Sequence, residues 1–160
     1  MIVAAMVAGA LAANGCADAN GQFGRREVPV GTIAAIRAVK VYADPAFFAT
    51  RRQSGSGFYR AKAPVAVRTG KTITLSIARK DRALADLAFS HTRNGQERRT
   101  DVARFSACRR GHERGERGWS SWAGAFYLKR PGCVHLVAQE PGSARVHRGT
   151  LSFGMGTTCR

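Results

Sequence analysis

The sequence predicts an all-β protein, an antiparallel β-sandwich that follows an N-terminal export segment. Residues 72–77 (TITLSI) alternate polar and apolar side chains throughout, which is the pattern of a strand with one buried face. Further short stretches of this kind are separated by turns rich in glycine and proline, as in sandwich proteins. The chain has 160 residues, of which 44% are hydrophobic, so it is long enough to form one domain with its own core.

The chain opens with an apolar stretch. Residues 1–14 (MIVAAMVAGALAAN) carry no charge, and the first charged side chain is Asp18. About a dozen apolar residues are too few to cross a bilayer, which needs about 20, but they suit the core of a signal peptide. We therefore expect an extracytoplasmic protein, either secreted or anchored to the outer face of the cytoplasmic membrane. A buried apolar helix is the alternative.

Two processing sites compete at the end of this stretch. Residues 17–19 (Ala-Asp-Ala) form a small-x-small cleavage site. Residues 13–16 (Ala-Asn-Gly-Cys) resemble the box of bacterial lipoproteins, in which the thiol of Cys16 would receive a diacylglyceryl group. A lipid at Cys16 would tether the domain to the membrane by its N-terminus.

The predicted organisation has three parts. Residues 1–19 form the signal peptide or lipoprotein signal, residues 20–57 form a linker and a poorly defined N-terminal region, and residues 58–160 form the sandwich domain. Within the middle part, residues 32–48 carry a mixed apolar pattern that suits either a strand or a short helix, and residues 51–57 suggest an exposed loop.

The first half of the domain contains clear and ambiguous elements. Residues 64–67 (PVAV) predict a strand that turns at residues 68–71 into the alternating strand 72–77. Residues 81–89 are ambiguous, because their leucines have helical spacing with Asp81 as an N-cap, whereas the alternation around Leu87 suits a strand.

The second half predicts four more strands. Residues 102–108 and 133–139 each place apolar side chains at every second position, and residues 151–155 do so again near the end of the chain. Residues 122–128 hold aromatic and aliphatic side chains. Two turn sequences separate the later strands, Arg-Pro-Gly at 130–132 and Pro-Gly-Ser at 141–143.

The order of these last strands resembles the end of an immunoglobulin-like domain, where a Pro-Gly corner precedes a central strand that pairs with the terminal one. With strand 102–108 antiparallel beside strand 133–139, this resemblance implies that Cys108, Cys133 and Cys159 gather at one end of the sandwich. In an exported domain a disulfide is the default expectation. Any pair could bridge, and Cys108–Cys133 is favoured, with Cys159 as the other candidate partner.

A metal site is the rival use of the cysteines. Cys108 lies four residues before His112, and Cys133 lies two residues before His135. Zinc sites usually show paired C-x-x-C knuckles, and these spacings differ from that pattern. We therefore expect no metal and no cofactor.

Four segments carry a further resemblance. Residues 104–108 (RFSAC), 122–126 (WAGAF), 130–134 (RPGCV) and 151–154 (LSFG) resemble a group of uncharacterised exported actinobacterial proteins. The resemblance covers about the last sixty residues. It implies a location and a fold, and it implies no activity.

The chain is strongly basic. Lysine and arginine number 26 against ten acidic residues, which gives a net charge of +16. Such a charge attracts polyanions, although an arginine-rich composition can also reflect a GC-rich genome. The densest run lies between residues 93 and 117, beside two tryptophans, and its candidate polyanion-binding residues are Arg98, Arg99, Arg109, Arg110, Arg114 and Arg117.

The alternative for this run is a solvated loop whose glutamates partly offset its charge. No helix-turn-helix or RNA-recognition pattern accompanies it, so we expect no specific nucleic acid as partner. The partner is unknown, and an anionic cell-envelope polymer or a membrane surface would suit the charge.

Catalytic signatures are missing from the sequence. It holds no G-x-S-x-G, no H-E-x-x-H and no P-loop. Carboxylates are scarce, and none pair at the ends of neighbouring predicted strands, as glycoside hydrolysis would need. A dyad of Cys133 and His135 would fit on one face of a strand, but a disulfide is the commoner use of such a cysteine. We therefore predict a non-enzymatic binding or structural module with no catalytic residue.

Overall fold

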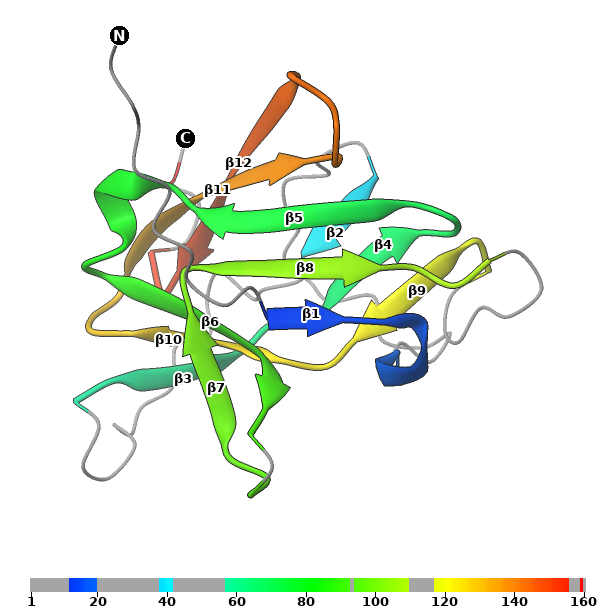
Figure 1. Ribbon diagram of the computed structural model, residues 1–160. Helices are drawn as coiled ribbons and strands as arrows, with labels where there is room; N and C mark the ends of the chain where they lie inside the picture. Colours follow the sequence, from blue (N-terminus) through cyan, green and yellow to red (C-terminus); the bar gives the residue numbers. More distant parts are fainter. Residues whose placement is uncertain are drawn as a thin grey trace, which may run out of the picture.

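The computed structural model describes residues 12–19, 38–41, 57–92, 94–109, 117–155 and 159 (Figure 1). Within these residues the protein is all-β, with two single turns of 3-10 helix, η1 (Cys16–Asp18) and η2 (Arg79–Asp81). The strands are β1 (Ala12–Asn14), β2 (Val39–Val41), β3 (Tyr59–Lys62), β4 (Val65–Arg68), β5 (Thr72–Ile77), β6 (Ala85–His91), β7 (Glu97–Thr100), β8 (Val102–Ser106), β9 (Trp119–Trp122), β10 (Ala125–Leu128), β11 (Gly132–Gln139) and β12 (Val146–Phe153). Neither helical turn in this part of the chain is long and apolar enough to span a membrane.

The strands form three sheets. The five-stranded sheet has the order β1-β8-β5-β11-β12, the four-stranded sheet β3-β10-β6-β7, and the three-stranded sheet β2-β4-β9. All pairs among the described strands are antiparallel except β1 and β8, which run parallel. In Figure 1, β5, β8 and β1 lie side by side across one face.

The two smaller sheets are joined by strand pairs that continue from one sheet into the other. Strand β3 passes into β4 through Ala63 and Pro64, and β9 passes into β10 through Ala123 and Gly124. At this break the amide of Ala63 donates to the carbonyl oxygen of Gly124 at 3.1 Å. A Cβ on Gly124 would lie 2.1 Å from the Phe89 ring. Only glycine therefore lets the strand bend over this core aromatic.

Aromatic side chains fill the space between the layers. Phe105 of the five-stranded sheet packs against Phe89 of the four-stranded sheet at 5.3 Å and against Trp122 of the three-stranded sheet at 5.2 Å between ring centroids. Phe126 and Phe153 form a similar pair across the layers at 5.0 Å. These rings belong to one buried cluster shared by all three sheets. The all-β, sandwich-like prediction is confirmed at this level.

The ambiguous residues 81–89 form a strand. They begin in the single turn η2 and continue into β6, so the helical interpretation was wrong. Strand β6 carries a bulge between Leu87 and Ser90, which places three successive residues in buried positions. This irregularity explains why the sequence shows no clean alternation there.

The predicted domain boundary at residue 58 separates strands that pair with one another. Strand β1 lies inside the predicted signal segment, and β2 lies inside the predicted linker, yet each pairs with a strand of the domain. Within residues 32–48, where the sequence suits either a strand or a short helix, residues 39–41 form strand β2. The remainder of residues 20–57, apart from residues 38–41 and Gly57, lies outside the described residues.

The disulfides correct the predicted pairing. Cys16 is bonded to Cys108 and Cys133 to Cys159, so the favoured Cys108–Cys133 bridge does not form. The reason lies in the sheet order, because β5 lies between β8 and β11, where direct pairing of β8 with β11 was expected. Strand β8 therefore runs parallel to β11, which places Cys108 and Cys133 at opposite ends of the sheet.

The strand topology explains why Cys108 is bonded to Cys16 and Cys133 to Cys159. Parallel pairing of β1 with β8 brings Cys16 to the end of β8, beside Cys108. At the open end of the β11–β12 hairpin, Gly132 lies opposite Phe153. Cys159, six residues after Phe153, can therefore reach Cys133. Cys159, the other candidate partner, is thus the one that Cys133 uses. The sulfur of Cys16 lies in this disulfide, whereas lipidation needs it as a free thiol, and lipidation stays a prediction.

Candidate functional site

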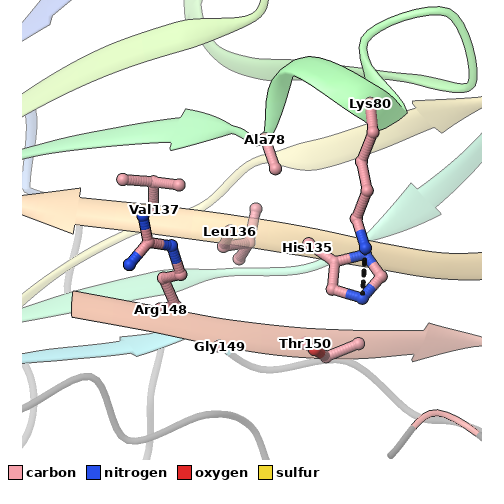
Figure 2. A pocket seen from close by; sticks show the side chains of 8 residues that line it. All are labelled: Ala78, Lys80, His135, Leu136, Val137, Arg148, Gly149 and Thr150. Atoms are coloured by element: carbon pink, nitrogen blue, oxygen red, sulfur yellow. Dashed lines mark hydrogen bonds between the residues drawn. The ribbon is translucent and has the colours of Figure 1, made fainter. Parts of the chain in front are cut away.

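A shallow hollow of about 310 Å³ lies on the outer face of the β11–β12 hairpin, beside the turn η2. We call it the β11–β12 hollow; Figure 2 shows its lining of Ala78, Lys80, His135, Leu136, Val137, Arg148, Gly149 and Thr150.

Strand alternation places the polar side chains of the hollow. Leu136 and its neighbours at every second position of β11 point into the core, so His135 and Val137 lie on the other face. Across the hairpin, Thr150 is opposite His135 and Arg148 is opposite Val137. The same pattern that predicts the strand therefore also predicts a polar row on its outer face.

The His135 ring lies between the carboxylate of Asp81 and the ammonium group of Lys80. The carboxylate oxygen Oδ2 of Asp81 accepts hydrogen bonds from the backbone N–H and from Nδ1 of His135, each at 2.7 Å. On the other side, Nζ of Lys80 lies 3.1 Å from Nε2 of His135 (Figure 2). An ammonium group can only donate, so Nε2 accepts and the proton of the neutral ring is on Nδ1. Both ring nitrogens are thereby occupied.

The charge of the hollow is one-sided. Lys80 and Arg148 contribute two cations, and Thr150 adds a hydroxyl group, whereas the described lining contains no carboxylate. Asp81 is not one of the lining residues, and its Oδ2 oxygen accepts hydrogen bonds from His135. Guanidinium and ammonium groups that line one hollow without a carboxylate suit an oxyanion such as phosphate or carboxylate.

The described arginines of the arginine-rich run fall into two groups. Arg98 and Arg99 lie on β7, before β8, whereas Arg109 follows β8 and Arg117 precedes β9. The length of β8, about 13 Å, separates the two groups. Arg109 and Arg117 lie at the same end, because the amides of Thr69 and Gly70 donate to the carbonyl oxygens of Gly118 and Cys108. Arg110 and Arg114, the remaining candidates, lie outside the described residues.

Arg99 serves the packing of the four-stranded sheet. Its guanidinium lies 4.2 Å from the ring centroid of Phe58 and 5.4 Å from that of Tyr127, and its Nε lies 3.6 Å from Oδ2 of Asp86. These contacts commit the side chain to neighbours within the protein. The expectation that Arg99 is available for a polyanion is therefore not supported by its surroundings.

A second charged network lies next to Arg99 on the outer face of the four-stranded sheet. Glu97 accepts hydrogen bonds from the Arg60 guanidinium, one of them from Nε at 2.9 Å, and from the hydroxyl group of Tyr127. The hydrogen bonds from Arg60 and Tyr127, opposed by partial burial, lower the pKa of Glu97, and Glu97 in turn raises the pKa of Arg60. Burial raises the pKa of Asp86 and outweighs the opposing effect of Arg99.

Sequence reasoning missed the His135 cluster. It interpreted Asp81 as a helix cap and His135 as half of an improbable thiol dyad, whereas the bond between Cys133 and Cys159 removes that thiol. The only available signal was the position of His135 on the outer face of a strand. Asp81 lies 54 residues earlier in the chain, and no local pattern links the two.

Comparison of the chain with protein-family models, with curated proteins and with solved structures finds no match. The resemblance to exported actinobacterial proteins thus stays a prediction. The assignment of function rests on the geometry alone.

Proposed function

We propose that this protein is an exported, non-enzymatic β-sandwich module that binds an anionic ligand in the β11–β12 hollow. The ligand class is a phosphate or carboxylate group, such as an anionic polymer of the cell envelope carries. The observation that carries the proposal is the lining itself, which includes Lys80, Arg148 and Thr150 and contains no acidic residue among those described.

The hydrogen bonds around His135 support a binding role over catalysis. Nδ1 of His135 is hydrogen-bonded to Asp81, and Nε2 is hydrogen-bonded to Lys80. The imidazole ring therefore offers no free nitrogen that could act as a general base. Its contribution is to hold the Lys80 ammonium over the strand. An arriving oxyanion would meet a positioned lysine, which limits the entropy lost on binding.

The disulfides support export. Disulfides form and persist in oxidising compartments, and all four cysteines of the chain are paired. The apolar opening of the sequence suits the same location. The protein would then act in the cell envelope or outside the cell.

Equilibrium binding of inorganic phosphate tests the site. Replacing Arg148 by glutamine is expected to weaken binding about tenfold, since a charge-assisted hydrogen bond contributes about 1.5–3 kcal/mol, and to do so at physiological ionic strength. Isothermal titration of the oxidised protein measures the Kd. Lys80→Gln is expected to act in the same direction.

The matched control is Arg145→Gln. Arg145 is an exposed residue of the β11–β12 turn and does not line the hollow, so this variant removes the same charge without touching the site. Equal weakening by Arg145→Gln and Arg148→Gln would show that only the net charge attracts phosphate. That result would overturn the proposal.

A further inference from the structure

The hydrogen bonds that hold His135 do not depend on the charge of its ring. Oδ2 of Asp81 accepts from the backbone N–H and from Nδ1 of His135, each at 2.7 Å. Nδ1 carries a proton in the neutral ring of this tautomer and also in the imidazolium ion. The strand itself is tied to the start of η2, because the amide of Ala78 donates to the carbonyl oxygen of His135 at 2.8 Å. Protonation of the ring therefore changes only the role of Nε2.

Nε2 of His135 changes from an acceptor to a donor when the ring is protonated. In the neutral ring it accepts a hydrogen bond from Nζ of Lys80, at 3.1 Å (Figure 2). In the imidazolium ion both ring nitrogens donate, and two cations at this distance repel each other. The Lys80 side chain is exposed, so it is free to leave. The Nε2–H group of His135, a lining residue, is then directed at whatever occupies the hollow.

The charges around His135 come from the turn before β6 and from the neighbouring strand. Turn η2 contributes the Asp81 carboxylate on one side of the ring and the Lys80 ammonium on the other, whereas its Arg79 does not line the hollow. Strand β12 contributes Arg148 to the lining. Strands β11 and β5 have no charged residue other than His135 itself.

These charges link protonation of the ring to binding of an anion. Asp81 favours the imidazolium ion through its contact with Nδ1, whereas the cations Lys80 and Arg148 oppose it. An oxyanion in the hollow removes that opposition because it compensates both cations. By reciprocity, the protonated ring strengthens binding of the anion.

We propose that His135, as the imidazolium ion, is a third cationic ligand of the oxyanion in the β11–β12 hollow, so that the protein binds its ligand more tightly in acidic surroundings. The inference rests on the proposed function and adds its dependence on pH. Histidine is the side chain whose charge changes between pH 5 and 8. The solvent supplies the proton for Nε2, and Asp81 keeps its hydrogen bond to Nδ1. The Nε2–H group, the Arg148 guanidinium and the released Lys80 ammonium then donate to the anion.

Sulfate is the probe that separates the protein from its ligand. It keeps one charge state between pH 5 and pH 8, whereas phosphate changes its own. Isothermal titration of the oxidised protein at physiological ionic strength measures the Kd. We expect the Kd to fall about tenfold from pH 8 to pH 5, since one charge-assisted hydrogen bond is added. A Kd that stays constant or rises as the pH falls would contradict the inference.

Two histidine variants assign the effect. In His135→Gln the amide oxygen can still accept from Lys80, but the side chain cannot take up a proton, so the ratio of the Kd values at the two pH values is expected to approach one. The matched control is His147→Gln. His147 lies opposite Ala138, on the other face of the hairpin, and does not line the hollow, so this variant is expected to keep the full ratio.

The outcomes separate this inference from the proposed function. If His135→Gln keeps the tightening, or if His147→Gln loses it to the same extent, His135 is not the third ligand, and the anion-binding hollow stands without it. If sulfate binding does not saturate at either pH, or if Arg148→Gln leaves it unchanged, the hollow is not an anion site and both proposals fall.

A measurement on the unmodified protein makes the test independent of the folding of any variant. Calorimetry in two buffers of different ionisation enthalpy counts the protons that accompany sulfate binding. Between pH 5 and pH 8 we expect net proton uptake, because binding favours the imidazolium ion. Binding with no uptake, or with release of a proton, would overturn the inference.

Discussion

The two outer faces of the sandwich use charge in opposite ways. On the four-stranded sheet, Arg60 and Glu97 form an ion pair that Tyr127 completes, and Arg99 faces Asp86. On the five-stranded sheet, the β11–β12 hollow collects Lys80 and Arg148 with no carboxylate in its described lining. The cations of the first network are paired with carboxylates, whereas the described lining of the hollow contains none.

This difference separates structural from functional arginines in a very basic chain. Net charge alone cannot do so, because +16 is spread over the whole sequence. A guanidinium stacked on aromatic rings and paired with a carboxylate is part of the packing. A guanidinium that shares a hollow with an ammonium and a hydroxyl group is the kind that we propose for binding.

The largest expected effect is on the paired face. Glu97→Ala removes the acceptor of Arg60 and of the Tyr127 hydroxyl group, and Tyr127 is only 4% exposed. We expect a loss of about 2 kcal/mol in the free energy of unfolding, reduced from the buried-pair range because the Arg60 side chain is 37% exposed. Urea unfolding measures it.

Glu140→Ala provides the comparison. Glu140 pairs with Lys71 at 3.0 Å, and the Glu140 side chain is 35% exposed, whereas that of Glu97 is 18% exposed, so a loss of at most about 0.5 kcal/mol is expected. Equal losses in the two variants would mean that the network around Glu97 is no more than a surface ion pair.

The pH dependence of stability gives the next effect. Because the pKa of Glu97 is lowered mainly by its hydrogen bond from Arg60, the folded state binds fewer protons than the unfolded state. The stabilisation is complete above the ordinary glutamate pKa and is lost as the pH falls through the lowered value. Asp86, whose pKa is raised by burial, contributes in the opposite sense, and its stabilisation is lost as the pH rises.

Glu97→Gln isolates the first contribution. Unfolding measured from pH 7 to pH 3 is expected to show a shallower acid loss in this variant than in the unmodified protein, with Asp86 unchanged in both. A steeper acid loss in Glu97→Gln would contradict the direction of the Glu97 pKa shift.

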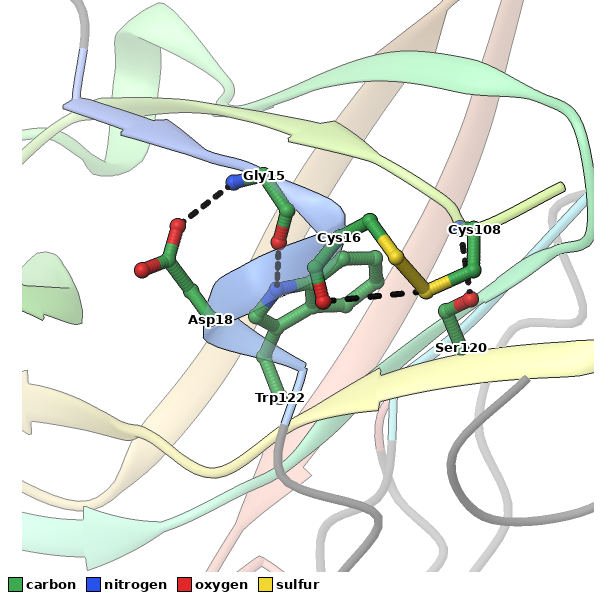
Figure 3. Close-up of a disulfide and its surroundings, with 6 residues drawn as sticks. All are labelled: Gly15, Cys16, Asp18, Cys108, Ser120 and Trp122. Carbon is green, nitrogen blue, oxygen red and sulfur yellow. Dashed lines mark hydrogen bonds between the residues drawn. A yellow bond between two sulfur atoms is a disulfide. The ribbon is translucent and has the colours of Figure 1, made fainter. Parts of the chain in front are cut away.

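The sequence predicted where the strands lie along the chain better than it predicted their order in the sheets. Alternation in TITLSI and in the segment after Pro131 identified β5 and β11, because burial of one face imposes a period of two. It did not reveal that β5 separates β8 from β11, since strand order depends on long-range packing. That one error placed Cys108 beside Cys133 in the prediction and produced the wrong disulfide, whereas Cys108 is bonded to Cys16 (Figure 3).

The candidate site was less accessible to sequence reasoning. His135 was visible on an outer strand face, but its partner Asp81 comes from a turn that the sequence left between helix and strand. The arginine-rich run was visible as composition, yet β8 separates its described members, Arg98 and Arg99 on one side and Arg109 and Arg117 on the other. Local patterns specify which face a residue takes, and tertiary packing specifies what it meets there.

The smallest expected effect is on the hollow face without ligand. Lys80→Gln and Arg148→Gln are expected to change the free energy of unfolding by no more than about 0.5 kcal/mol, or to raise it slightly, because neither has a carboxylate partner in the described lining. Thermal or urea unfolding in phosphate-free buffer measures this. A loss comparable to that of Glu97→Ala would show that these side chains are structural.

The most direct test of the anion-binding hollow is an NMR titration of the oxidised protein with inorganic phosphate at physiological ionic strength. The account predicts saturable shifts confined to the amides of η2 and of the facing parts of β11 and β12, and to the imidazole of His135. Shifts that grow without saturation and spread over the exposed arginines of the whole surface would contradict it.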